Sequence, residues 1–294
     1  MRIRQSRADR AISAVFTAVQ IVITLLAVYP MYFVLVASFS GAKDIANGSV
    51  WLFPKNLTLL GYQYMARYER LWLGYRNTIF YTLLGTAISL ALIIPAGYAL
   101  SRRDFALKRF CIIYFTITMF ISGGLIPTYF VVQRLGMLDT VWSLVLPGAV
   151  SVFYIILART FFQTSIPPEL LDAAVIDGCG DGRFFLYIVL PLSKAIIAVI
   201  GLYCAVGHWN SYFNALIYIR NPKLVPLQLV LRDLLISYSM DASAATGTNR
   251  LEQQQLSDLI KYCVIVASTL PVMLIYPFIQ KYFVQGTMIG SVKG

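Results

Sequence analysis

Long apolar segments alternate with shorter polar ones along most of this 294-residue chain. Each apolar segment has at least about the twenty residues that a helix needs to cross the hydrocarbon core of a bilayer. The pattern predicts an all-α membrane protein of one domain, residues 1–294, with six transmembrane helices at about 12–39, 77–100, 110–132, 140–162, 188–209 and 262–283. Polar loops at about 41–76 and 210–258 are expected on the outer side, and a polar segment at 167–187 on the inner side.

Composition supports a membrane protein and argues against several other classes. Hydrophobic residues make up 59% of the chain and charged residues 13%, with a mean hydropathy of +0.71, whereas soluble domains carry about a quarter charged residues. The net charge of +11 does not indicate a nucleic-acid partner, because the basic residues bracket the apolar segments and form no stripe with aromatic residues. The cysteines form no CxxC pair and His208 is the single histidine, so no metal site is expected.

The short loops predict the orientation, because Lys and Arg accumulate on the cytoplasmic side. Four arginines lie at the N-terminus and four basic residues follow the second predicted helix: Arg2, Arg4, Arg7, Arg10, Arg102, Arg103, Lys108 and Arg109. In a six-helix arrangement both groups share one side with the two termini and with the segment at 167–187. We therefore expect that side to be the cytoplasm.

The polar segment at 167–187 has the pattern of a short amphipathic helix that is followed by a break. Pro167 and Pro168 suit the first turn of a helix, where a missing N–H costs nothing. Glu169 and Asp172 then place negative charge near the positive end of the helix dipole. Glycines at 178, 180 and 182 end the helix. A helix outside the bilayer, joined to transmembrane helices at both ends, is suited to receive a push from a soluble partner.

The spacing of residues in this segment resembles a known signature. Asp172-Ala173-Ala174, then three residues, Gly178, then nine residues, Ile188-x-Leu190-Pro191 is similar to the signature of permease subunits of bacterial ABC importers, with Asp172 where Glu is usual. Segments at 6–10, 29–30, 122–129, 208–210 and 292–294 resemble carbohydrate importer permeases. They are most similar to the branch that moves complex or acidic oligosaccharides, such as alginate and rhamnogalacturonan fragments.

The resemblance implies a type I ABC importer permease fold with a cytoplasmic coupling helix, in the bacterial inner membrane. It also implies a second, different permease subunit, two ATPase subunits that bind ATP and Mg, and an extracytoplasmic solute-binding protein, with no cofactor in this chain. The residues that would contact or position the ATPase are Glu169, Asp172, Ala173, Ala174, Asp177, Gly178, Ile188, Leu190, Pro191, Lys293 and Gly294. The alternative for the segment is a helix that lies on the membrane surface, and the alternative for the last residues is a frayed tail.

An oligosaccharide path calls for aromatic rings that stack on sugar faces and for amides that bind hydroxyl groups. The candidates near the outer half of the predicted helices are Tyr129, Tyr154, Tyr203, His208, Trp209, Asn210, Tyr212 and Asn214. For Trp209 and Tyr212 the alternative is an interfacial aromatic belt, and His208 alone is more often a packing residue. The small polar segment at 237–250 suggests a contact with the solute-binding protein through Ser237, Tyr238, Asp241, Ser243, Thr246 and Asn249, or else a disordered loop.

The energy source is expected to lie outside this chain. No Asp or Glu lies well inside a predicted transmembrane helix, and the chain has no phosphate-binding loop of the GxxxxGK[S/T] type. A self-sufficient secondary carrier typically needs intramembrane ionisable groups, and a membrane enzyme needs clustered catalytic groups. The first outer loop carries Lys43, Lys55, Arg67, Arg70 and Arg76 against two carboxylates. This positive charge suits a polyanionic oligosaccharide or an acidic binding protein, and a neutral malto-oligosaccharide stays an alternative substrate.

Overall fold

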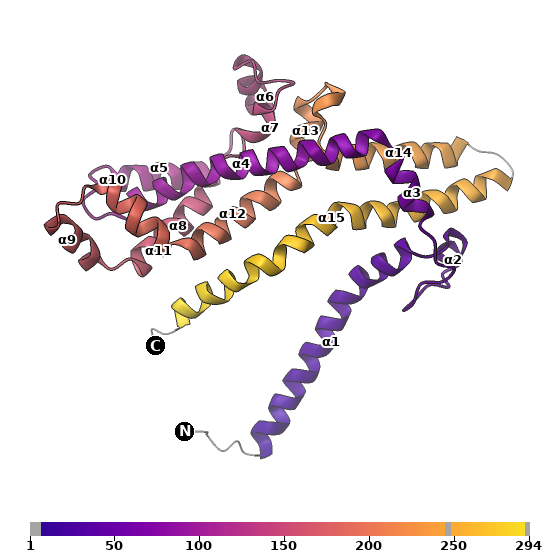
Figure 1. Ribbon diagram of the computed structural model, residues 1–294, viewed down its shortest axis with the longest axis horizontal. Coiled ribbons are helices and arrows are strands. Elements are labelled where there is room, and N and C mark those ends of the chain that lie inside the picture. Colours follow the sequence, from indigo (N-terminus) through magenta and orange to yellow (C-terminus); the bar gives the residue numbers. More distant parts are fainter. Residues whose placement is uncertain (1–6, 245–247, 292–294) are drawn as a thin grey trace. The chain divides into compact units, whose positions relative to one another are not determined.

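The computed structural model describes residues 7–244 and 248–291, in which all regular structure is helical. Figure 1 shows the helices in chain order. They are α1 (Arg7–Ser38), α2 (Ala42–Ala46), α3 (Leu60–Ala66), α4 (Glu69–Ser101), α5 (Lys108–Phe120), α6 (Leu125–Arg134), α7 (Trp142–Val145), α8 (Val152–Ser165), α9 (Pro168–Ile176), α10 (Asp181–Phe184), the π-helix η1 (Phe185–Val189), α11 (Leu190–Leu192), α12 (Lys194–Trp209), α13 (Phe213–Tyr218), the 3-10 helix η2 (Pro222–Leu224), α14 (Leu227–Ala244) and α15 (Thr248–Ser291).

The chain forms two compact units. Unit 1 comprises Met1–Glu69 and Leu231–Leu270, and unit 2 comprises Arg70–Val230 and Pro271–Gly294. Both units combine segments that are distant in the sequence.

Unit 1 joins the end of α1 to α3 and to the first part of α15. The rings of Phe33 and Tyr262 meet edge to face with centroids 5.9 Å apart. The hydroxyl of Tyr62 donates to the Ser38 hydroxyl at 2.8 Å, and the Cys263 thiol donates to the Ser38 carbonyl. The rest of α1 has few neighbours: none of the residues in its most apolar window is buried. That surface is suited to lipid or to another subunit.

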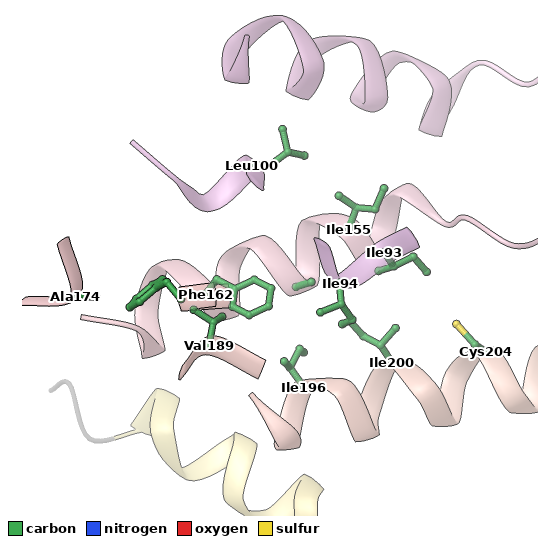
Figure 2. Packing of buried hydrophobic residues seen from close by; sticks show 12 residues of the cluster. Ile93, Ile94, Leu100, Ile155, Phe162, Ala174, Val189, Ile196, Ile200 and Cys204 are labelled. Atoms are coloured by element: carbon green, nitrogen blue, oxygen red, sulfur yellow. The ribbon is translucent and has the colours of Figure 1, made fainter. Parts of the chain in front are cut away.

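Unit 2 has a core of apolar side chains from α4, α8 and α12. Figure 2 shows this cluster, with side chains of the three helices directed toward one another. Its main members are Ile93, Ile94, Leu100, Ile155, Ala158, Phe162, Ile196 and Ile200, all of them buried. Two further members, Phe184 and Val189, come from α10 and η1. The core thus extends from the long helices into the segment around α9.

The described residues contain three helices that are long and apolar enough to cross a membrane, or five crossings if each of two sharply bent helix pairs counts as one. The predicted helix at 110–132 is one such pair, because the chain bends by 115° between α5 and α6. Ser122, Gly123 and Gly124 lie at the bend, and Gly124 has a φ of +84°, which a continuing helix does not allow. The second bend, of 80°, separates Asp181–Leu192 from α12.

Two other predicted elements differ from the structure. The segment at 140–162 is not one helix but α7 and α8, with Pro147 and Gly148 between them. The predicted outer loop at 210–258 is mostly helical, in α13, α14 and the start of α15. In α14 the buried residues Leu227, Val230, Leu231 and Leu234 recur at helical spacing, with polar residues such as Arg232 and Asp233 between them.

Gly97 sets the close approach of α4 to α8. A Cβ atom at Gly97 would lie 2.6 Å from the Cβ of Ala158 and 3.1 Å from the backbone nitrogen of Arg159. We expect Gly97→Ala to lower the free energy of unfolding by about 1–3 kcal/mol, because the two helices would have to separate. Thermal denaturation of the purified protein in detergent measures the effect.

Gly201 provides the matched control in the same core. A Cβ atom there would meet only the Leu90 side chain, at 3.4 Å, an ordinary contact. Gly201→Ala should therefore be neutral or slightly stabilising, since Ala favours a helix over Gly by about 1 kcal/mol. Equal denaturation temperatures for the two variants would show that the α4–α8 approach is not tight.

Candidate functional site

The residues next to each end of α9 determine where this helix begins and ends. Pro167 precedes the helix in an extended conformation and Pro168 is its first residue. At the other end the N–H of Cys179 donates to the carbonyl of Ala174 at 2.8 Å, and the N–H of Gly178 donates to the carbonyl of Val175 at 3.0 Å. This pair of bonds is a Schellman motif, which requires the left-handed φ of +72° that Gly178 adopts. Gly178 therefore ends the helix for a conformational reason.

The two sides of α9 have different surroundings. Ala174 is buried and Leu171 packs against the core cluster. The predicted coupling residues Glu169, Asp172, Ala173 and Asp177 are exposed. Two apolar residues that the sequence signature did not single out are exposed with them: Val175 at 62% and Ile176 at 85%. No local pattern in the sequence marks these two residues as exposed, because their exposure depends on which neighbours the fold brings near.

The remaining residues of the signature anchor the segment. Ile188 and Leu190 pack against the core cluster, and Val189 between them is fully buried. Pro191 is exposed and cannot donate a helical hydrogen bond. Directly before the Leu190–Leu192 turn the chain adopts the π-helix η1, a form that is rare and often found at functional sites. Lys293 and Gly294, also predicted to reach the ATPase, lie outside the described residues.

Arg102 connects the end of α4 to the chain that follows α9. Its guanidinium donates to both carboxylate oxygens of Asp104, at 2.8 and 2.5 Å, and lies 3.1 Å from the carboxylate of Asp181. The hydrogen bonds from Arg102 hold the pKa of Asp104 below its usual value. The ammonium group of Lys108 caps the same helix end by donating to the carbonyls of Ser101 and Arg102. This end of α4 is thus strongly basic and ordered.

A cavity of about 560 Å³ lies between this helix end and the start of α9. Arg102, Arg103 and Lys108 line one part of it, and Pro168 and Asp172 line another. The basic loop and α9 therefore lie at the same end of unit 2, as the predicted topology requires.

The predicted substrate-path residues take part in several separate contacts. Tyr154 and Tyr203 stack with centroids 5.7 Å apart and ring planes 8° apart. Tyr129 stacks on Tyr218, at 6.1 Å. Tyr212 packs against a second apolar cluster that includes Tyr81, Leu144, Ala215 and Ile219. The stacked pair of Tyr154 and Tyr203 joins α8 to α12 and presents partly exposed rings.

The residues at the end of α12 differ in accessibility. Trp209 is buried, with its ring 6.5 Å from that of Tyr75. His208 lies against α4, so close to Gly85 that a Cβ atom there would be 2.5 Å from the imidazole. Asn210 is exposed and accepts a hydrogen bond from Gln228 at 3.5 Å, while Asn214 is half-buried. Of this group, Asn210 presents its polar side chain most openly.

The segment predicted to contact a binding protein is helical over most of its length. Ser237, Tyr238, Asp241 and Ser243 lie in α14, and Asn249 lies in α15. Ser237 and Ser243 are exposed, and each donates to a carbonyl in its own helix. Thr246 lies outside the described residues, as do the side chains of Asp241 and Asn249. The described part of 237–250 is therefore helical and not a disordered loop, and its contact with a binding protein stays a prediction.

No group of three or more metal-ligating side chains occurs in the described part of the chain. The arrangement at α9 offers instead an exposed apolar tip with carboxylates around it, on a helix that is packed into the core. Such a surface can bind a partner protein.

Comparison with known proteins gives the family. No protein-family model matches the chain. The protein LplC of Bacillus subtilis (strain 168) is 39% identical over 269 residues, which are 92% of this chain and 90% of LplC. The polygalacturonan/rhamnogalacturonan transport system permease protein YtcP of the same strain is 39% identical over 272 residues, 92% of this chain and 94% of YtcP. This chain belongs to the permease subunits of bacterial ABC importers.

The permease fold is also that of a solved structure. A chain in the crystal structure of a bacterial ABC transporter involved in the import of the acidic polysaccharide alginate superposes with a TM-score of 0.83 and 30% sequence identity, over 96% of this chain and 99% of that chain. The permease is therefore an all-α membrane protein and not a catalytic subunit. Membership of the family implies an ATPase and a solute-binding protein as partners.

Proposed function

We propose that the permease moves acidic oligosaccharides from a solute-binding protein into the cytoplasm, and that α9 is the coupling helix on which the ATPase acts. The main support for the coupling role is the exposed tip of α9. Val175 and Ile176 are largely exposed beside Asp172 and Asp177, on a helix whose other side is buried. An exposed apolar patch with a polar rim is typical of a protein–protein contact.

The positions of the basic residues support a cytoplasmic location for α9. Arg102 and Arg103 follow α4, Lys108 and Arg109 begin α5, and Arg102 contacts Asp181, just after α9. Short basic loops stay on the cytoplasmic side. Both features lie in unit 2. We propose that the permease lies in the inner membrane with both termini in the cytoplasm, an arrangement that needs an even number of crossings.

The proposed assembly contains two different permease subunits, two copies of the ATPase with bound ATP and Mg, and one solute-binding protein. The exposed apolar face of α1 supports contact with lipid or with the second permease. The exposed surface of α14 at Ser237 and Ser243 is the candidate contact with the binding protein. No contact with nucleic acid is proposed.

Two observations support an acidic substrate. YtcP is named for polygalacturonan and rhamnogalacturonan, and the structural relative takes part in the import of alginate; these are acidic polysaccharides. In the permease, Lys43, Lys55, Arg67, Arg70 and Arg76 are all exposed. On the proposed outer side they would attract a polyanion. The stacked Tyr154 and Tyr203 and the exposed Asn210 are the proposed contacts along the path, and a neutral oligosaccharide is the competing substrate.

Gly178→Trp tests the coupling role. No atom lies within 4 Å of a Cβ at this position, so a side chain can leave the backbone without a clash, although the positive φ strains the end of α9. We expect the complex to assemble but to transport several-fold less sugar per ATP hydrolysed, measured in proteoliposomes. Gly148→Trp, also at an open position, is the control. Normal sugar-stimulated ATPase activity and normal uptake in Gly178→Trp would contradict the proposal.

Ile176→Ser tests the docking surface itself. The side chain is 85% exposed, so its removal should leave the denaturation temperature of the permease unchanged. If Ile176 enters a groove on the ATPase, the loss of its buried area should weaken ATPase binding by about tenfold. Met240→Ser, which removes an exposed apolar side chain from α14, is the control. Unchanged ATPase affinity in Ile176→Ser would place the docking surface elsewhere.

The charge of the substrate is tested by reversing charges in the first outer segment. In the Lys43→Glu/Lys55→Glu variant we expect slower uptake of an oligosaccharide released from alginate at low salt, with a smaller difference at high salt because the charges are screened. Uptake of a neutral malto-oligosaccharide, if any, should not change. An equal loss for both sugars would indicate that these lysines contact the binding protein.

A further inference from the structure

A single guanidinium group links the end of α4 to the chain that follows α9. Arg102 donates to Asp104 in its own loop and lies 3.1 Å from Asp181, the first residue of α10. It also donates to the hydroxyl of Tyr98 at 3.2 Å and lies 6.0 Å above the ring of Tyr98. The side chain of Arg102 is only 16% exposed, so these neighbours restrict its orientation.

Tyr98 adds an apolar link at the same point. Its ring lies 5.7 Å from the ring of Phe162 in α8, before α9, and 4.9 Å from the ring of Phe185, after α10. The last turn of α4 therefore contacts the chain that enters α9 and the chain that leaves it. Arg102 extends this contact to the start of α10.

The chain between α9 and α10 has less support of its own, because only Cys179 in it packs against the core cluster. It consists of Asp177, Gly178, Cys179 and Gly180, and a Cβ atom at either glycine would meet nothing within 4 Å. Glycine peptides in open space bend at low cost. The two glycines therefore influence how much of a displacement of α9 reaches α10, and the contacts of α10 decide which helix it moves.

We propose that Arg102 is a positioning residue that holds α10 against the end of α4, so that a displacement passed from α9 to α10 also moves α4. The inference rests on the proposed coupling role of α9. In this proposal the Arg102–Asp181 ion pair transmits movement from α10 to α4 and takes no part in docking of the ATPase.

The ion pair is not needed for folding. The carboxylate of Asp181 is 77% exposed, and exposed ion pairs contribute little to stability. Phe184, three residues further on, is 2% exposed and anchors α10 by burial. A variant that loses only the ion pair should therefore fold and assemble, and its transport can be measured.

Asp181→Asn is the primary test, in the full complex with its partner permease, ATPase and binding protein in proteoliposomes. We expect ATP hydrolysis to continue. The amount of an alginate-derived oligosaccharide transported per ATP should fall by about two- to fivefold, which corresponds to the free energy of one exposed ion pair. Asp104→Asn leaves the carboxylate of Asp181 in place and should have a smaller effect. Asp233→Asn, which breaks the exposed pair with Arg232 in α14, should have none.

A double variant separates a direct link from a general structural effect. If Arg102 acts through Asp181, then Arg102→Gln/Asp181→Asn should transport no less per ATP than Arg102→Gln alone, because the same contact is lost in each. Additive losses would overturn the proposal. So would an equal loss in Asp104→Asn, which would assign the effect to the loop at 102–107.

Two further results distinguish this inference from the coupling role on which it rests. If Asp181→Asn weakens ATPase binding, then Asp181 contacts the ATPase directly and the positioning role is wrong. If Gly178→Trp uncouples transport but Asp181→Asn does not, then α9 is the coupling helix and Arg102 is not part of it. If neither variant uncouples transport, both proposals fail.

Discussion

Burial of Phe184 and Val189 against α4, α8 and α12 is the constraint on which the candidate site depends. Both side chains are almost completely inaccessible, and each such burial contributes roughly 1.5–3 kcal/mol, more than an exposed ion pair does. The polar segment is therefore an extension of the helical core, held through the residues that follow α9. Its exposed tip is presented from a packed base, and Arg102 adds a second contact at Asp181, three residues before Phe184.

The membrane environment explains why the rest of the chain is helical and where it is not. Backbone groups in the hydrocarbon region must be satisfied within the protein, which favours helices. The breaks occur at Ser122–Gly124, at Pro147 and Gly148, and at Ser193, where helix propensity is low. These interruptions shorten the continuous crossings and make non-helical backbone available within the subunit. Backbone of this kind is tolerated at membrane depth where it is buried in protein or lines a cavity.

The parts of the structure that the sequence predicted are those that rest on local signals. The ends of α9 follow from Pro168 and Gly178, because each acts on its own φ angle. The exposure of Ile176, the burial of Trp209 and the contact of Arg102 with Asp181 depend on neighbours that are distant in the sequence, and no local pattern specifies them. The helices in 210–258 were not predicted because polar residues separate their buried apolar positions, such as Leu227 and Leu231. These polar residues lower the average hydropathy of the segment.

The π-helix at Phe185–Val189 sets the spacing between two buried anchors of the segment that follows α9. Phe184 lies directly before it and Val189 is its last residue, and both are buried. A π-turn holds about one residue more than an α-turn, so the loss of one residue here can be absorbed as ordinary α-helical winding. The loss of one residue within α9 has no such outlet, and it would turn the residues beyond it by about 100° about the helix axis.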